Sequence, residues 1–170
     1  MEKYQQAQAV AIRNLTVADH ILYVTYPVIQ DPKLLVGVLN NLFLALMNAM
    51  TAVLWHDRLF KLIPPFYDTF ESRFNMFRVK SMPQHNIEKR YSDLIQEMKE
   101  MTFLHKKSSV EFRRKDSFII CQDDYSTISI SASQLKEYVK TTKEFVKIMN
   151  VIVDKNERIL GRSAGRVKAC

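Results

Sequence analysis

An uncharged, largely apolar run of 23 residues, from Leu34 to His56, is the feature that most constrains how this chain folds. Lys33 precedes the run and Asp57 follows it. A segment of that length is long enough to cross a bilayer. It is also what the central helix of a bundle requires, because such a helix is covered by apolar neighbours on every side.

Three asparagines inside the run, Asn40, Asn41 and Asn48, favour the central helix over a membrane span. Their amides need hydrogen-bond partners, which hydrocarbon does not supply. We therefore expect a core helix and no membrane partner, and a single span over residues 34–56 is the alternative. The first residues lack the charged start and apolar core of a signal peptide, and two cysteines are too few for a disulfide framework. We expect a cytoplasmic protein.

Prolines and hydrophobic periodicity divide the chain into helices. Only 3 Gly and 5 Pro are present, which favours long helices. A first helix is predicted to end near Thr25 or Tyr26, before Pro27, and a second to start at Asp31-Pro32. The second is predicted to reach about residue 62, a short third to cover about 68–79, and a fourth to follow Pro83 and end near residue 105.

The period then changes from helical to alternating. Apolar and polar residues alternate between Val110 and Ile130, which predicts two or three short antiparallel strands. Ser131 and Gln134 have the spacing of a capping box and open a last helix. The sequence therefore predicts a mainly α fold, a bundle of four to five helices with a small antiparallel β segment (about 110–130) before the last helix. We expect a single domain over residues 1–154 and a mobile basic tail over 155–170.

Charge gives the first indication of a partner. The chain has 25 basic and 18 acidic residues, a net charge of +7, which suits an anionic partner such as RNA, DNA or a lipid surface. One candidate phosphate-binding cluster comprises Lys106, Lys107, Arg113, Arg114 and Lys115, and the tail adds Lys155, Arg158, Arg162, Arg166 and Lys168. Phe112 or Tyr125 is a candidate for stacking on a base. The alternative is a solvated strand edge, where basic side chains prevent aggregation.

Motifs for cofactor or metal chemistry are missing from the sequence. No glycine-rich phosphate-binding loop is present, and the four histidines are far apart in the sequence. We expect no cofactor and no metal site.

Two Arg-His pairs share a spacing of seven residues, which is two helical turns. Arg13 and His20 lie on one helix face, so the guanidinium can hold a phosphate while the imidazole transfers protons at a ribose 2′-hydroxyl. Arg78 and His85 have the same spacing, but Pro83 is expected to break the helix between them.

Arg13, Asn14 and His20, together with the helical layout over residues 4–150, resemble the HEPN families. That resemblance implies an RNA-associated helical bundle, with Arg13 and His20 as the catalytic pair of a metal-independent ribonuclease or with no catalysis at all. The other interpretation left open is a noncatalytic module that forms a homodimer or binds a protein partner.

Overall fold

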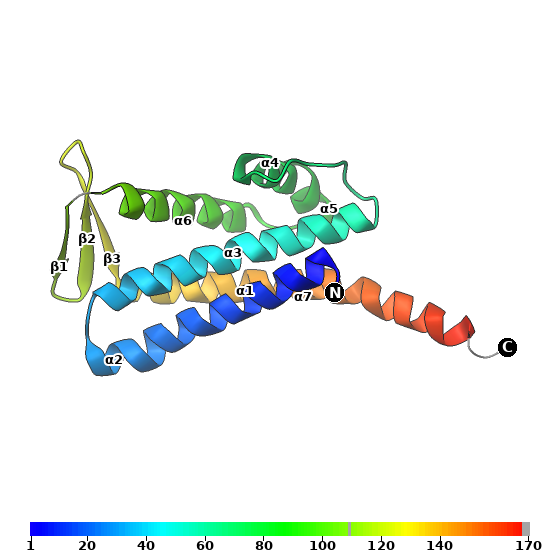
Figure 1. Ribbon diagram of the computed structural model, residues 1–170, viewed down its shortest axis with the longest axis horizontal. Helices are drawn as coiled ribbons and strands as arrows, with labels where there is room; N and C mark the ends of the chain where they lie inside the picture. Colours follow the sequence, from blue (N-terminus) through cyan, green and yellow to red (C-terminus); the bar gives the residue numbers. More distant parts are fainter. Residues whose placement is uncertain (109, 168–170) are drawn as a thin grey trace.

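A computed structural model describes the backbone of residues 1–108 and 110–167 and the side chains of 1–108 and 110–155 (Figure 1). It confirms the expected fold class. The chain forms a mainly helical bundle with a small three-stranded antiparallel sheet before the last helix. Figure 1 shows the sheet at one end of the bundle, beyond the first turns of α3 and α7.

The elements follow one another with short connections, and two of them are π-helical segments, labelled η. In chain order they are α1 (Lys3–His20), η1 (Ile21–Thr25), α2 (Tyr26–Ile29), α3 (Lys33–Leu59), α4 (Phe70–Met76), η2 (Phe77–Ser81), α5 (Met82–His85), α6 (Lys89–Lys107), β1 (Glu111–Arg114), β2 (Ser117–Cys121), β3 (Thr127–Ser131) and α7 (Ala132–Val167).

The apolar run forms α3, which packs against α1, α6 and α7 as the central helix. Its most deeply buried side chains have no more than 2% of their surface exposed and include Leu35, Leu39, Leu42, Leu46, Met50 and Leu54. Burying each of these contributes about 1.5–3 kcal/mol. The expected start is also found, since the Asp31 carboxylate accepts a hydrogen bond from the backbone N–H of Lys33 at 2.9 Å. By length and composition, α3 is the one helix in the described part of the chain that meets the requirement for a membrane span.

The first helix does not end before Pro27, contrary to the prediction. It continues through η1 into α2 and ends at Gln30, which has the left-handed φ of 57°. The N–H of Tyr26 bonds to the carbonyl of Ile21, five residues back, instead of four. A wide turn of this kind accommodates a proline, because the ring no longer meets the carbonyl it would strike in a regular α-helix.

The helix around Pro83 contains a wide turn of the same kind. The predicted break at Met82-Pro83 is wrong, because α4, η2 and α5 form one continuous helical stretch from Phe70 to His85. The N–H of Met82 bonds to the carbonyl of Phe77, again five residues back. Arg78 and His85 therefore lie on one helical stretch, but the wide turn rotates one relative to the other.

The sheet has the order β1-β2-β3, and its register determines which side chains share a face. Phe118 lies opposite Ile130, and Ile120 lies opposite Ile128. Three of these four are at most 5% exposed and belong to the core, so this is the face turned toward the helices. So small a sheet is stable only when it packs against helices, as it does here.

The last helix opens as expected but is longer. The Ser131 hydroxyl accepts a hydrogen bond from the N–H of Gln134 at 3.2 Å, which is half of the predicted capping box. The Gln134 side chain donates to Tyr138 instead of reaching back. The backbone of α7 is helical to Val167, so the boundary expected at Asp154 does not coincide with the end of a helix.

Candidate functional site

The basic residues predicted to bind phosphate lie at the sheet end of the molecule. Lys106 and Lys107 form the last turn of α6, and Arg113 and Arg114 belong to β1. Lys115 sits in the tight turn between β1 and β2 with a left-handed φ of 51°. The structure thus places all five residues around the edge strand of the sheet (Figure 1).

Strand β1 separates this cluster into two groups. Lys106 and Lys107 lie before the start of β1, and Arg114 and Lys115 lie at and beyond its end. At about 3.3 Å per residue, the four-residue strand holds them roughly 10 Å or more apart. Residues that are neighbours in the sequence are therefore presented at the two ends of one strand.

Arg113 has a structural role that the other four lack. Its guanidinium lies 3.2 Å from the carboxylate of Asp31, at the start of α3. Arg113 pairs with Phe118 across the strands and so belongs to the face turned toward the helices. The remaining four, Lys106, Lys107, Arg114 and Lys115, are exposed and form no ion pair within the described residues.

The same hairpin lies close to α2. Asp116, in the turn between β1 and β2, and Tyr26, which begins α2, line one pocket. Burial raises the pKa of the Tyr26 phenol, and the negative charge of Asp116 raises it further. This pocket and the ion pair of Arg113 with Asp31 place the end of β1 beside the bundle.

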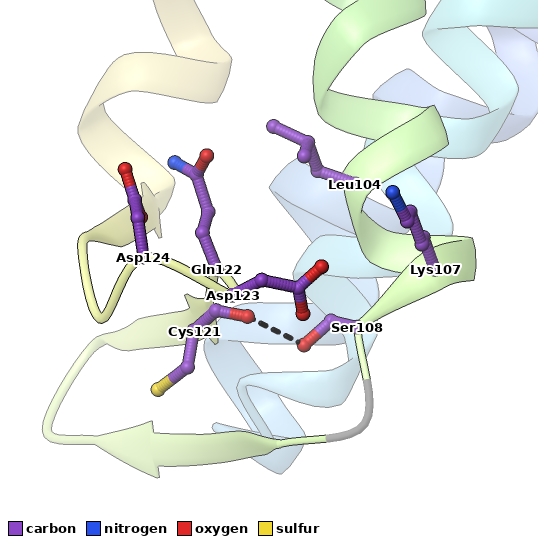
Figure 2. Close-up of a pocket in the computed structure, with 7 residues that line it drawn as sticks. All are labelled: Leu104, Lys107, Ser108, Cys121, Gln122, Asp123 and Asp124. Carbon is purple, nitrogen blue, oxygen red and sulfur yellow. Dashed lines mark hydrogen bonds between the residues drawn. The ribbon is translucent and has the colours of Figure 1, made fainter.

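Lys107 lines a pocket of about 220 Å³ between the end of α6 and the turn that joins β2 to β3. Figure 2 shows Lys107 and Leu104 on one side and Asp123 and Asp124 on the other. The Ser108 hydroxyl donates a 2.9 Å hydrogen bond to the carbonyl of Cys121, and this bond joins the end of α6 to the end of β2. Two carboxylates at its rim make this pocket mixed in charge, so it is not a phosphate cradle.

The outer face of the sheet carries one aromatic side chain. Phe112 lies opposite Ile119, which in turn lies opposite Ser129. Phe112 is 46% exposed, and its cross-strand neighbour Ile119 is 8% exposed. Tyr125, the other candidate for stacking, is 95% exposed in the turn between β2 and β3 and so does not belong to this face.

The first Arg-His pair is solvent-facing on α1. Arg13 and His20 are both exposed, and neither forms a hydrogen bond or ion pair with a described residue. The Asn14 amide donates to the carbonyl of Val10 in its own helix. No carboxylate orients the His20 ring, so the described structure shows no preorganised acid-base group there.

A polar cluster that the sequence analysis missed lies at the other end of α3. The Asp57 carboxylate is fully buried and accepts a hydrogen bond from the Ser81 hydroxyl at 2.7 Å. His85 Nε2 lies 2.7 Å from the same carboxylate, and His56 Nδ1 lies 3.2 Å from it. His56 and His85, far apart in the sequence, therefore lie at the same carboxylate.

The electrostatics of the cluster favour an ionised carboxylate. Burial raises the pKa of Asp57, but hydrogen bonds from His56, His85 and Ser81 outweigh burial, so the pKa lies below its ordinary value. Arg78 is exposed, and its guanidinium lies over the ring of Phe74, 5.6 Å from the centroid. The second Arg-His pair is thus divided, with the histidine turned inward and the arginine outward.

A signal for this cluster is present in the sequence only as a charge at the end of an apolar run. Asp57 marks the end of the uncharged run in the sequence, whereas in the structure it lies among the buried residues of α3. Its partners Ser81 and His85 are 24 and 28 residues away, beyond the reach of local periodicity.

Some predicted residues cannot be placed. The side chains of Arg158, Arg162, Arg166 and Lys168 lie outside the described residues. Lys155 is exposed on α7. Within the described part of the chain, no group of three or more His, Cys, Asp or Glu side chains has the arrangement of a metal site.

Comparison of the chain with protein-family models, with curated proteins and with solved structures gave no match.

Proposed function

We propose that this chain is an RNA-associated protein that binds the phosphate backbone at the sheet end of the bundle. The observation that carries the proposal is the set of four exposed cations around β1 that have no ion-pair partner in the described structure, namely Lys106, Lys107, Arg114 and Lys115. Lysines and arginines that are paired within a fold contribute little to a partner, whereas unpaired ones release counterions when they meet phosphates.

RNA is preferred among anionic partners because of the chain's resemblance to the HEPN families, which rests on Arg13, Asn14 and His20 within a helical bundle. The proposal concerns binding and not catalysis. Neither Arg13 nor His20 contacts a described group that would orient it for proton transfer. The basic residues after Asp154 are part of the proposal as further phosphate-binding residues, on the basis of the sequence alone.

Charge reversal tests this proposal. The variant Arg114→Glu/Lys115→Glu is expected to weaken binding of a labelled RNA at least about tenfold at low salt. The matched control is Lys140→Glu/Lys147→Glu, which makes the same change in net charge at two exposed positions of α7 away from the sheet. Equal loss of affinity in both variants would show attraction to net charge alone, and the site would be withdrawn.

A second candidate function, self-association, is favoured by exposed apolar residues on α1 and η1. Ile12, Val17, Tyr23 and Val24 are between 41% and 54% exposed. Side chains of this kind, when contiguous, mark protein interaction surfaces. Light scattering across a concentration series tests it. A dimer that dissociates in Val17→Asp/Val24→Asp would support it, and a monomer at all concentrations would exclude it.

A further inference from the structure

Within the described residues, the outer face of the sheet is more exposed than the face turned toward the helices. The helix-facing side is occupied by Phe118, Ile120 and Ile130, all at most 5% exposed. On the opposite side, Ser129 and Thr127 are exposed and Phe112 is 46% exposed. The two faces alternate because successive side chains of a strand point to opposite sides.

Phe112 lies on this face in the edge strand β1. Its neighbours across the strands on the same face are Ile119 and then Ser129. From β1 to β3 the face is about 10 Å wide, given a strand spacing of about 4.8 Å. That width accommodates a single base laid on one aromatic ring.

One cation shares the outer face with Phe112. Arg114, two residues later on β1, belongs to this face, since it pairs with Ser117. Lys107, at the end of α6, lies instead over the ring of Phe103, 5.9 Å from its centroid. A backbone that follows β1 therefore meets an aromatic ring and then a positive side chain.

We propose that this face selects single-stranded RNA, with an unpaired base stacked on Phe112 and the adjacent phosphate held by Arg114. The inference rests on the proposed function and adds its substrate class. In a duplex the bases are stacked within the helix and the faces are not available, so a duplex meets only the cations. A single strand meets the cations and the aromatic ring together.

The test compares three RNA probes of about 12 nucleotides: a single-stranded oligoadenylate, an abasic strand of the same length, and a duplex. Single-stranded RNA is expected to bind about tenfold more tightly than the abasic strand, because both carry the same phosphates and only the first carries bases. In Phe112→Ala this preference is expected to vanish, while binding of the abasic strand stays as in the wild type.

Two further variants serve as controls. Phe112→Leu keeps an apolar side chain beside Ile119 but removes the aromatic ring. This variant is expected to lose the preference for the single strand over the abasic strand, without a change in melting temperature. Tyr125→Ala removes an exposed aromatic ring outside this face, in the turn between β2 and β3, and is expected to keep the preference.

The outcomes separate the two proposals. Equal binding of all three probes by the wild type overturns the stacking inference and leaves phosphate binding intact. An undiminished preference in Phe112→Leu likewise overturns it. Absence of binding to any probe at low salt removes the proposed function, and the inference falls with it.

Discussion

The imidazole of His85 lies 2.7 Å from the carboxylate of Asp57, which joins the end of the central helix to the end of the stretch that follows Phe70. The same carboxylate accepts a hydrogen bond from Ser81, in the second π-helical segment. One fully buried acid therefore holds α3, η2 and α5 together. The sheet lies at the opposite end of α3, about 40 Å away along a helix of 27 residues.

Removal of this carboxylate is predicted to destabilise the fold strongly. Asp57→Ala removes the acceptor of the buried Ser81 hydroxyl and of His85, and the free energy of unfolding is expected to fall by about 3 kcal/mol. Urea denaturation measures this. Asp93→Ala, which removes an exposed carboxylate paired with Lys89, is expected to change stability little. A small effect in Asp57→Ala would show that the cluster does not hold α5.

Stability is predicted to depend on pH through Asp57. Its pKa in the folded chain is below the ordinary value of an unfolded Asp, so the unfolded state binds more protons as the pH falls. The contribution is complete above about pH 4 and declines at lower pH. The difference in unfolding free energy between wild type and Asp57→Asn should therefore shrink between about pH 4 and pH 2. A constant difference would contradict the assignment.

The proline in α5 is predicted to cost little where it stands. In a regular helix interior, replacing proline by alanine gains about 3 kcal/mol. Here the wide turn over Phe77–Ser81 precedes Pro83, so Pro83→Ala is expected to change stability by less than about 1 kcal/mol. Thermal denaturation of the two proteins decides between these values. A gain in stability of about 3 kcal/mol would mean that the wide turn does not relieve the steric clash of the proline ring.

The central position of α3 is testable with two leucines of the same helix. Leu46 is fully buried, and Leu46→Ala is expected to cost about 2–5 kcal/mol of unfolding free energy. Leu44 is 46% exposed, so Leu44→Ala is expected to cost far less. Urea denaturation in detergent-free buffer compares them. Equal costs would contradict the burial of Leu46 and the exposure of Leu44.

Much of the fold follows from local patterns. The apolar run, the Asp31 cap, the alternation from Val110 and the Ser131 cap each depend on residues within one or two turns, and each is found in the structure. The reading of prolines as helix ends failed at Pro27 and Pro83. A π-helical turn changes which carbonyl a proline ring meets, and no local residue pattern indicates it.

The candidate site was predictable in composition but not in arrangement. The basic residues of the 105–115 stretch are visible in the sequence, yet their separation by β1 and the pairing of Arg113 with Asp31 depend on the hairpin register and on packing against α3. The Asp57 cluster depends on contacts across 24 to 28 residues, which periodicity does not report.

The most direct measurement of the central claim is the salt dependence of binding to single-stranded RNA, followed by fluorescence anisotropy of the labelled strand. Four unpaired cations at the sheet end predict a linear plot of log affinity against log salt with a slope of about −3, and Arg114→Glu/Lys115→Glu should reduce it to about −1.4. No binding at low salt, or a slope unchanged by the double reversal, would contradict the account.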